Sequence, residues 1–213
     1  EFDLRNFAFP GIRSPADSGS FNYTGGAHPL FAAALRADSL SYRSDTLVSS
    51  AWQFTSTSLA VSGRPDSLGW SLGTGIGYLT RLDAAGRWAR AAAGPGMLVA
   101  FDTLAIRLPT RTWRLDAPTT LALGDSAPTI GTTRLSAADG SGAVTVAGRF
   151  PKDRPGDLTL DAFGVDLRDV YDLMGRDTTG IAGDIGLNLH LAGTARDPTI
   201  HGTVSLADAR FSE

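Results

Sequence analysis

The sequence contains no cysteine, few lysine or glutamate residues, and no long apolar run. Without cysteine there are no disulfide bridges and no thiolate metal clusters, a composition that fits both a cytosol and a bacterial periplasm. The longest apolar stretches, residues 30–35 and 89–101, fall short of the ~20 residues that a membrane-spanning helix needs. The net charge of -3 is spread without a basic stripe, so we expect no nucleic-acid partner.

The chain of 213 residues is long enough for one large all-β domain or two small ones. It begins with Glu1-Phe2-Asp3, with no Met, basic segment or apolar leader, so we expect it to be a piece of a longer protein. Its 25 glycines and many Ser and Thr residues favour strands and turns over helices.

Alternation of apolar and polar residues is the dominant pattern, and it is clearest in residues 184–192 and 199–206. Such alternation predicts strands with one apolar face. Residues 193–198 between them are rich in turn formers, and a turn over residues 194–197 predicts a hairpin with a defined register. In that register three apolar pairs share one face: Leu191 with Ile200, Leu187 with Val204, and Ile185 with Leu206.

Other segments show the same alternation less regularly. Residues 144–150 and 157–161 predict two strands joined by residues 151–156. Changes of face at Leu40/Tyr42 and at Leu98/Ile106 predict bulges or bends. The earlier candidate strands are residues 36–42, 46–54, 57–61, 68–79, 97–108 and 112–123.

One short helix is predicted over residues 167–174. Apolar residues at positions 167, 170, 171 and 174 follow the helical spacing. Asp166 can cap its N-terminus, and Gly175 can end it.

The motif Gly124-Asp125-Ser126 resembles the surroundings of the nucleophile in GDS-type esterases. A catalytic serine should open a helix and receive an Asp and a His from later in the chain, whereas Pro128 and a strand start follow Ser126. The segment from Leu121, LALGDSAPTIG, also echoes the segment from Leu189, LHLAGTARDPTIHG. We therefore interpret Ser126 as a hairpin-turn residue.

Three other groups of residues could suggest a site. His190 and His201 face each other in the predicted register, but two imidazoles flanked by Asn and Thr are a poor zinc site, so we expect solvated polar residues. Residues 73–77, GTGIG, lack the Lys and the following helix of a phosphate loop and predict a flexible or bulged strand. Solubility and helix capping account for the carboxylates Asp157, Asp161, Asp166 and Asp169. We expect no enzymatic activity, metal or cofactor.

Six segments carry a resemblance to a known family: WRLDAP (113–118), GAVTVAG (142–148), DLTLD (157–161), DLRDVY (166–171), GDIGL (183–187) and LAGTARDPTIHG (191–202). Together they resemble the TamB family and its relatives in the AsmA-like superfamily of bacterial envelope proteins. The resemblance covers residues 113–213 as a TamB-like segment. Before it, turn-forming residues indicate that residues 1–30 are a loop or the end of a preceding unit, and the candidate strands indicate a β-rich segment over residues 31–112.

The resemblance implies an all-β fold, an elongated and mostly antiparallel curved sheet that forms an apolar-lined groove (a β-taco) with one short helix. It also implies a periplasmic location in an inner-membrane-anchored protein. Such proteins are associated with phospholipid transport to the outer membrane and, through a TamA-like outer-membrane barrel protein, with outer-membrane protein assembly.

Strands with one apolar face must bury that face, and in a groove the covering group is partly an acyl chain. We therefore expect phospholipid acyl chains and adjacent segments of the longer chain as partners. The alternative is a scaffold that pairs its strand edges with nascent outer-membrane strands, without lipid transport. The predicted groove lining is Val144, Val146, Leu158, Leu160, Ile185, Leu187, Leu189, Leu191, Ile200, Val204 and Leu206.

Overall fold

The computed structural model describes residues 2–9, 12–26, 28–42, 52–77, 79–91, 96–124, 128–149, 155–174, 180–194 and 197–211. Side chains are described within these ranges except at residues 2–9, 12–16, 42, 52 and 211.

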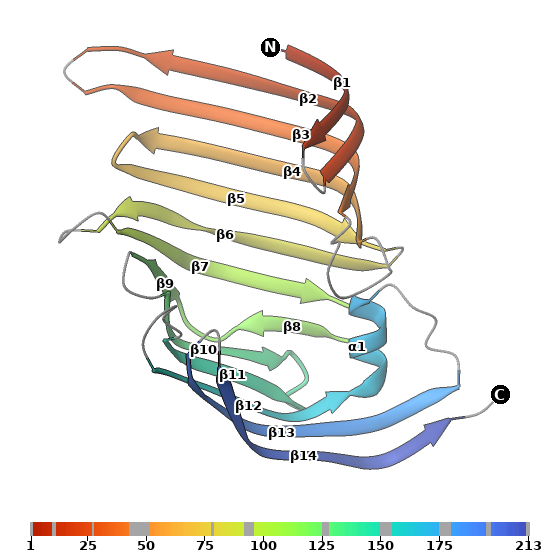
Figure 1. Ribbon diagram of the computed structural model, residues 1–213. Coiled ribbons are helices and arrows are strands. Elements are labelled where there is room, and N and C mark those ends of the chain that lie inside the picture. The colour runs from red at the N-terminus through yellow and green to blue at the C-terminus, as the bar shows by residue number, and fades with distance from the viewer. Residues whose placement is uncertain are drawn as a thin grey trace.

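The described residues form fourteen strands and one helix, which follow one another along the chain (Figure 1). The strands are β1 (Phe2–Phe9), β2 (Ile12–Thr24), β3 (Leu30–Tyr42), β4 (Trp52–Arg64), β5 (Ser67–Ile76), β6 (Thr80–Arg90), β7 (Met97–Arg107), β8 (Thr112–Leu115), β9 (Thr119–Leu123), β10 (Thr129–Ala137), β11 (Ala143–Arg149), β12 (Gly156–Asp166), β13 (Ile181–Gly193) and β14 (Pro198–Phe211). The helix α1 (Leu167–Leu173) lies between β12 and β13.

All the strands belong to one antiparallel sheet, in which neighbours in sequence are mostly neighbours in space. The exception lies between β7 and β10, where β8 and β9 each pair with both of these strands. The all-β, antiparallel, curved sheet with one short helix is the fold class that the sequence predicts.

The hairpin of β13 and β14 has the predicted register. Ile185 pairs with Leu206, Leu187 with Val204 and Leu191 with Ile200. The turn is closed by two backbone hydrogen bonds of 3.1 Å between Thr194 and Asp197, one in each direction. Turn chemistry and side-chain alternation were together sufficient to set this pairing.

The register divides the sheet into two faces, because directly opposed residues point to the same side. We call the side that carries Leu187 the concave face and the other side the convex face. The concave face runs without interruption from β2 to β14. One row across it consists of Phe21, Ala33, Val61, Trp70, Gly86, Phe101 and Thr119. Another consists of Leu115, Leu135, Val144, Ala162, Leu187 and Val204.

The sheet curves around the concave face (Figure 1). Leu108, which follows β7, forms a buried cluster on this side with Trp113 of β8 and Ala137 at the end of β10. Residues of β7, β10, β11, β12 and α1 pack against it: Ile106, Leu135, Val144, Val165 and Leu173. Side chains from so many successive strands can meet only where the sheet bends toward them.

Bulges contribute to the bending. The pairing register shifts once in each of five strand pairs: β4 with β5, β6 with β7, β10 with β11, β12 with β13, and β13 with β14. An extra residue in one strand of a pair bends that strand and increases its twist. The shift in β7 leaves Asp102 without a direct partner in β6, and it explains the predicted change of face between Leu98 and Ile106.

The helix confirms the predicted cap. The Asp166 carboxylate accepts a hydrogen bond of 2.8 Å from the Arg168 backbone N–H. The helix ends at Leu173, with Met174 as its C-cap, one residue earlier than predicted. Gly175 lies outside the described residues.

Three expectations for the first half of the chain need correction. Residues 1–30 contain β1 and β2, so the loop alternative for them is wrong: pairing with β3 holds β2 extended despite its Ser, Gly and Asn residues. The predicted strand over residues 112–123 is divided into β8 and β9. The strand β6 was not predicted, because charged side chains and Ala-Ala-Gly weaken its pattern.

A backbone contact at a bulge gives a test of the fold. A Cβ at Gly86 would overlap the carbonyl oxygen of Ala100, whereas a Cβ at Gly69 would meet only the Ser62 carbonyl oxygen at an ordinary 3.6 Å. We expect Gly86→Ala to lower the free energy of unfolding by about 2 kcal/mol or more and Gly69→Ala to change it by less than about 1 kcal/mol. Urea unfolding measures both, and equal effects would contradict the described pairing of β6 with β7.

Candidate functional site

All eleven predicted lining residues lie on the concave face. Their cross-strand partners form an unbroken pattern through β11, β12, β13 and β14: Leu160 pairs with both Val146 and Leu189, and Leu158 pairs with Leu191. The structure therefore brings together on one surface the residues that alternation selected.

Exposure on this face is greatest near its two sides. On β14 the side chains of Ile200, Val204 and Leu206 are 61%, 68% and 51% exposed. On β2, Phe21 and Tyr23 are 55% and 61% exposed. Lining residues of β11, β12 and β13 are half-buried. The apolar face is thus open, and most of its large side chains are not enclosed in a core.

The total accessible surface supports this description. The chain of 22.3 kDa exposes 13592 Å². A compact monomer of this mass would expose roughly 9,400 Å². The chain therefore exposes more surface than a compact protein of its mass. Such an excess is expected when one face of a broad sheet is not covered by a second layer.

One predicted lining residue also belongs to the interior. Val144 packs against the buried cluster of Leu108, Trp113 and Ala137. The helix α1 closes the same end of the strands, where Leu173 joins this cluster. The α1 end of the concave face is therefore filled by protein, and the open lining lies farther along the strands.

The concave face also extends beyond the predicted lining. It includes an edge-to-face pair of Trp70 and Phe101, whose ring centroids are 5.2 Å apart, and a second pair of Phe21 and Phe31 at 5.1 Å. Trp70 and Phe101 were missed because bulges in β4 and β7 interrupt the alternation near them, and Phe21 and Phe31 precede the first predicted strand, residues 36–42. The sequence did carry a signal for this face: apolar residues two positions apart, Leu59 with Val61 and Trp70 with Leu72.

Hydroxyl groups on the concave face are paired with one another. Thr57 and Thr74 lie 2.7 Å apart between their Oγ1 atoms, and so do Thr119 and Thr133. All four side chains belong to buried residues. Because each hydroxyl has a partner, these polar atoms do not interrupt the apolar surface with unsatisfied hydrogen-bonding groups.

The convex face carries cross-strand polar pairs. Arg87 and Asp102 form an ion pair of 3.1 Å between β6 and β7, and Asp83 pairs with both Arg81 and Arg107. Exposed pairs of this kind add little stability. They keep the convex face hydrated, in contrast to the opposite side.

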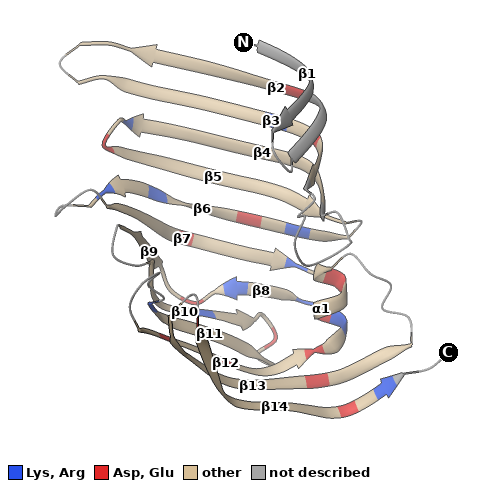
Figure 2. Ribbon diagram, viewed as in Figure 1, with Lys and Arg blue, Asp and Glu red and all other residues tan. Residues whose placement is uncertain are grey.

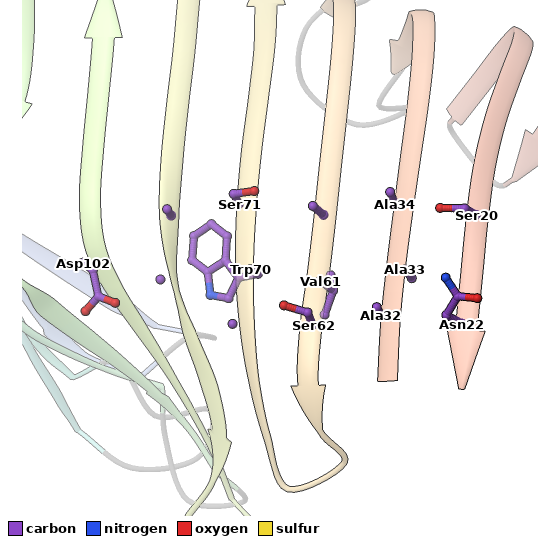
Figure 3. Close-up of a pocket in the computed structure, with 14 residues that line it drawn as sticks. Ser20, Asn22, Ala32, Ala33, Ala34, Val61, Ser62, Trp70, Ser71 and Asp102 are labelled. Carbon is purple, nitrogen blue, oxygen red and sulfur yellow. The ribbon is translucent and has the colours of Figure 1, made fainter. Parts of the chain in front are cut away.

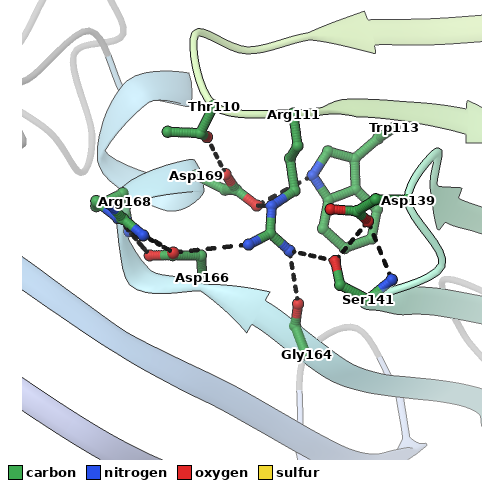
Figure 4. A network of polar contacts seen from close by, with 9 residues as sticks. All are labelled: Thr110, Arg111, Trp113, Asp139, Ser141, Gly164, Asp166, Arg168 and Asp169. Carbon is green, nitrogen blue, oxygen red and sulfur yellow. Dashed lines mark hydrogen bonds and ion pairs between the residues drawn. The ribbon is translucent and has the colours of Figure 1, made fainter.

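A polar network fixes the closed end of the sheet around Arg111, which lies in the connection between β7 and β8 (Figure 4). Its guanidinium lies 3.2 Å from Asp169 and 3.6 Å from Asp166. It also donates to the Ser141 hydroxyl at 2.9 Å and to the Gly164 carbonyl oxygen at 3.1 Å. One side chain thus joins the β7–β8 connection to the β10–β11 turn, to β12 and to α1.

Asp169 is the most deeply buried member of the network. The residue is 1% exposed, and it accepts hydrogen bonds from Thr110 at 2.9 Å and from the Trp113 indole N–H at 3.1 Å. Solubility is therefore the wrong explanation for Asp169: its carboxylate holds α1 against β8. Figure 2 shows charges of both signs in α1 and in the adjoining ends of β7, β8 and β12.

The carboxylates of α1 and its cap differ in their proton affinity. Burial raises the pKa of Asp169, although Thr110, Arg111 and Trp113 oppose the shift. At Asp166, burial acts to raise the pKa, but the hydrogen bonds and charge of Arg168 outweigh it, so that pKa is lowered. The network therefore combines one carboxylate that is stabilised as an anion with one whose ionised form carries a desolvation cost.

A hollow of about 490 Å³ lies mainly over the convex side of β2 to β7 (Figure 3). Its size alone would admit a small molecule. However, its lining is mostly Ala, Ser and Gly, and its one carboxylate, Asp102, is already paired with Arg87. Small side chains therefore account for the hollow.

The GDS motif and the glycine-rich residues 73–77 have structural roles, as far as they lie within the described residues. Residues 125–127, including Ser126, lie outside the described residues. Their flanks pair as a hairpin, Leu121 with Ile130, and the strand β10 follows rather than a helix. In the echoing segment, Ile200 stands at the place of Ile130 and pairs with Leu191. Gly73 to Ile76 belong to β5, and the bulge opposite them lies in β4.

The two histidines pair across β13 and β14 as predicted. His190 is exposed, and its Nε2 atom lies 2.9 Å from an Asp157 carboxylate oxygen. The described part of the chain contains no group of three or more His, Cys, Asp and Glu side chains arranged to hold a metal ion.

The network around Arg111 gives a test of how the closed end is held. Arg111→Met would leave Asp169 buried without its cation, so we expect the free energy of unfolding to fall by about 3 kcal/mol. Adding Asp169→Leu should restore part of this loss, because neither charge is then buried. The control Arg107→Met removes a half-exposed partner of Asp83 and should cost less than about 1 kcal/mol. Equal losses for Arg111→Met and Arg107→Met, by urea unfolding, would show that the network does not hold this end.

Across the described residues, no helix combines the length and apolarity needed to cross a bilayer. The chain matches no known family model, curated protein or solved structure.

Proposed function

We propose that this chain is a segment of a TamB-like envelope protein and that its concave face holds phospholipid acyl chains during transport between the inner and outer membranes. The observation that carries the proposal is the continuous, open apolar face from β2 to β14. This role needs binding and passage, and it requires no catalytic group or cofactor.

The energetics of burial support an acyl chain as the occupant. Each methylene group removed from water contributes about 0.8 kcal/mol, so ten methylenes of a tail contribute on the order of 8 kcal/mol before the costs of ordering. The same contact covers exposed protein side chains such as Val204 and Leu206. Apolar contact has no preferred direction, so a tail can move along such a surface without breaking a specific bond.

The dimensions of the sheet also favour passage over storage of one molecule. The main path of the sheet contains thirteen strands. At about 4.8 Å between neighbours, it extends roughly 60 Å along its curve. One lipid tail spans about half of a ~30 Å hydrocarbon core, or about 15 Å. The concave face is therefore several tails long.

The resemblance supplies the cellular part of the proposal. A periplasmic location, an inner-membrane anchor elsewhere in the protein, a TamA-like outer-membrane partner and a contribution to outer-membrane protein assembly are proposed on the six sequence segments that resemble the TamB family. We also propose that an adjacent segment of the same protein pairs with β14, which among the described strands pairs with β13 alone.

The edge of the sheet at β14 favours a second candidate function. A strand of 14 residues with an unpaired edge can accept another strand by β-augmentation. In this alternative the chain is a scaffold for outer-membrane strands and carries no lipid.

Site-specific photo-crosslinking tests the proposal. Leu189 lies on the concave face opposite Leu160, whereas its neighbour Asn188 is exposed on the convex face and hydrogen-bonded to Asp161. A photoreactive residue at position 189 should capture phospholipid in cell envelopes, and one at position 188 should not, as measured by mass spectrometry of the adducts. Equal lipid labelling at both positions would remove the lipid proposal. Polypeptide adducts in place of lipid would favour the scaffold.

A further inference from the structure

One arginine differs from the others in where the strand pairing places it. Arg90, at the end of β6, pairs with Met97 of β7, and by alternation it falls on the side of Gly86 and Trp88, the concave face. Among the arginines of β3 to β14, the register assigns the rest to the convex face: Arg36, Arg64, Arg81, Arg87, Arg107, Arg114, Arg134, Arg149 and Arg210.

Arg90 is also exposed and has no carboxylate partner among the described residues. The other two arginines of β6 are paired, Arg81 with Asp83 and Arg87 with Asp102. A free cation at the margin of an apolar surface is therefore a particular property of this position on β6.

On the β7 side the surroundings of Arg90 are apolar, whereas on the β5 side its backbone N–H donates a hydrogen bond of 3.2 Å to the Asp66 carbonyl oxygen. Met97 pairs with Arg90 on one side and with Leu123 of β9 on the other, and Trp88 precedes Arg90 on the same face. An arginine can lay its methylene stem along such side chains while its guanidinium remains in water. At this position, apolar side chains lie beside a guanidinium group that remains in water.

Arg90 lies at the open end of the strand. At the other end of β6, Thr80 donates a hydrogen bond of 3.2 Å to the Asp172 carbonyl oxygen of α1, where the concave face is filled. Ten residues separate Thr80 from Arg90, about 33 Å of extended chain. An amphiphile would therefore meet Arg90 at the end of the strands opposite α1, where no described helix covers the face.

We propose that Arg90 binds the phosphate of a phospholipid headgroup while the tail of the same molecule lies on the concave face beside it. The site rests on the proposed lipid-holding function and adds to it a headgroup contact. A guanidinium matches phosphate with two parallel charge-assisted hydrogen bonds.

The length of a lipid tail agrees with this placement. A tail of about 15 Å that starts at Arg90 reaches about as far as Gly86, since four strand residues span about 13 Å. Gly86 pairs with both Trp70 and Phe101. The tail would thus pass Trp88 and end near the Trp70–Phe101 pair, so tryptophan fluorescence can report its presence.

The test compares two lipids that carry the same nitroxide-labelled tail, phosphatidylglycerol and diacylglycerol, in detergent micelles with the 213-residue chain. Quenching of tryptophan fluorescence gives the affinity for each lipid. We expect the chain to bind both, with Arg90→Gln weakening phosphatidylglycerol about fivefold and leaving diacylglycerol unchanged. Arg90→Lys should retain part of the preference. The control Arg114→Gln removes an exposed arginine of the convex face and should weaken neither lipid.

Each alternative result is decisive. If Arg90→Gln and Arg114→Gln act alike, or if Arg90→Gln weakens both lipids equally, the headgroup site is wrong and the lipid-holding function stands. If the unsubstituted chain binds neither lipid, the proposed function fails and the site fails with it. If inorganic phosphate displaces the labelled phosphatidylglycerol as well as unlabelled phosphatidylglycerol does, Arg90 belongs to a free-phosphate site and the headgroup assignment is wrong.

Discussion

The structure depends on one constraint: a broad sheet with a single apolar face must remove that face from water. Ordinary sandwiches do this with a second sheet. Here curvature encloses only part of the face, at the cluster around Trp113 and Ala137, while Ile200 and Val204 remain mostly exposed. The remaining apolar surface is the physical reason to expect an apolar occupant, and its length is the reason to expect one that moves.

Two kinds of feature set the curvature. Bulges bend individual strands, and they recur from β4 to β14, so the bending is distributed across the sheet. The network around Arg111 acts at one place, where it joins α1 to β12, to the β7–β8 connection and to the β10–β11 turn. Apolar contact supplies the driving force for bending, whereas buried charge specifies where the sheet closes.

Sequence reasoning succeeded where local rules decide the structure. The register of Leu187 with Val204 follows from alternation and turn chemistry, and the Asp166 cap follows from helix-end chemistry. It failed where distant residues decide. The buried state of Asp169 depends on Arg111, 58 positions earlier in the chain, and no local pattern joins them. The concave face of the first half was missed because bulges in β4 and β7 shift the alternation, and because β2 was interpreted as a loop or the end of a preceding unit.

We propose that the concave face holds lipid tails. Native mass spectrometry of the chain, after incubation with phospholipid vesicles and removal of free lipid, tests it most directly. The account predicts a mass of 22.3 kDa accompanied by species that carry one and more than one phospholipid, because the face is several tails long. A chain that emerges only as the bare polypeptide would contradict the account.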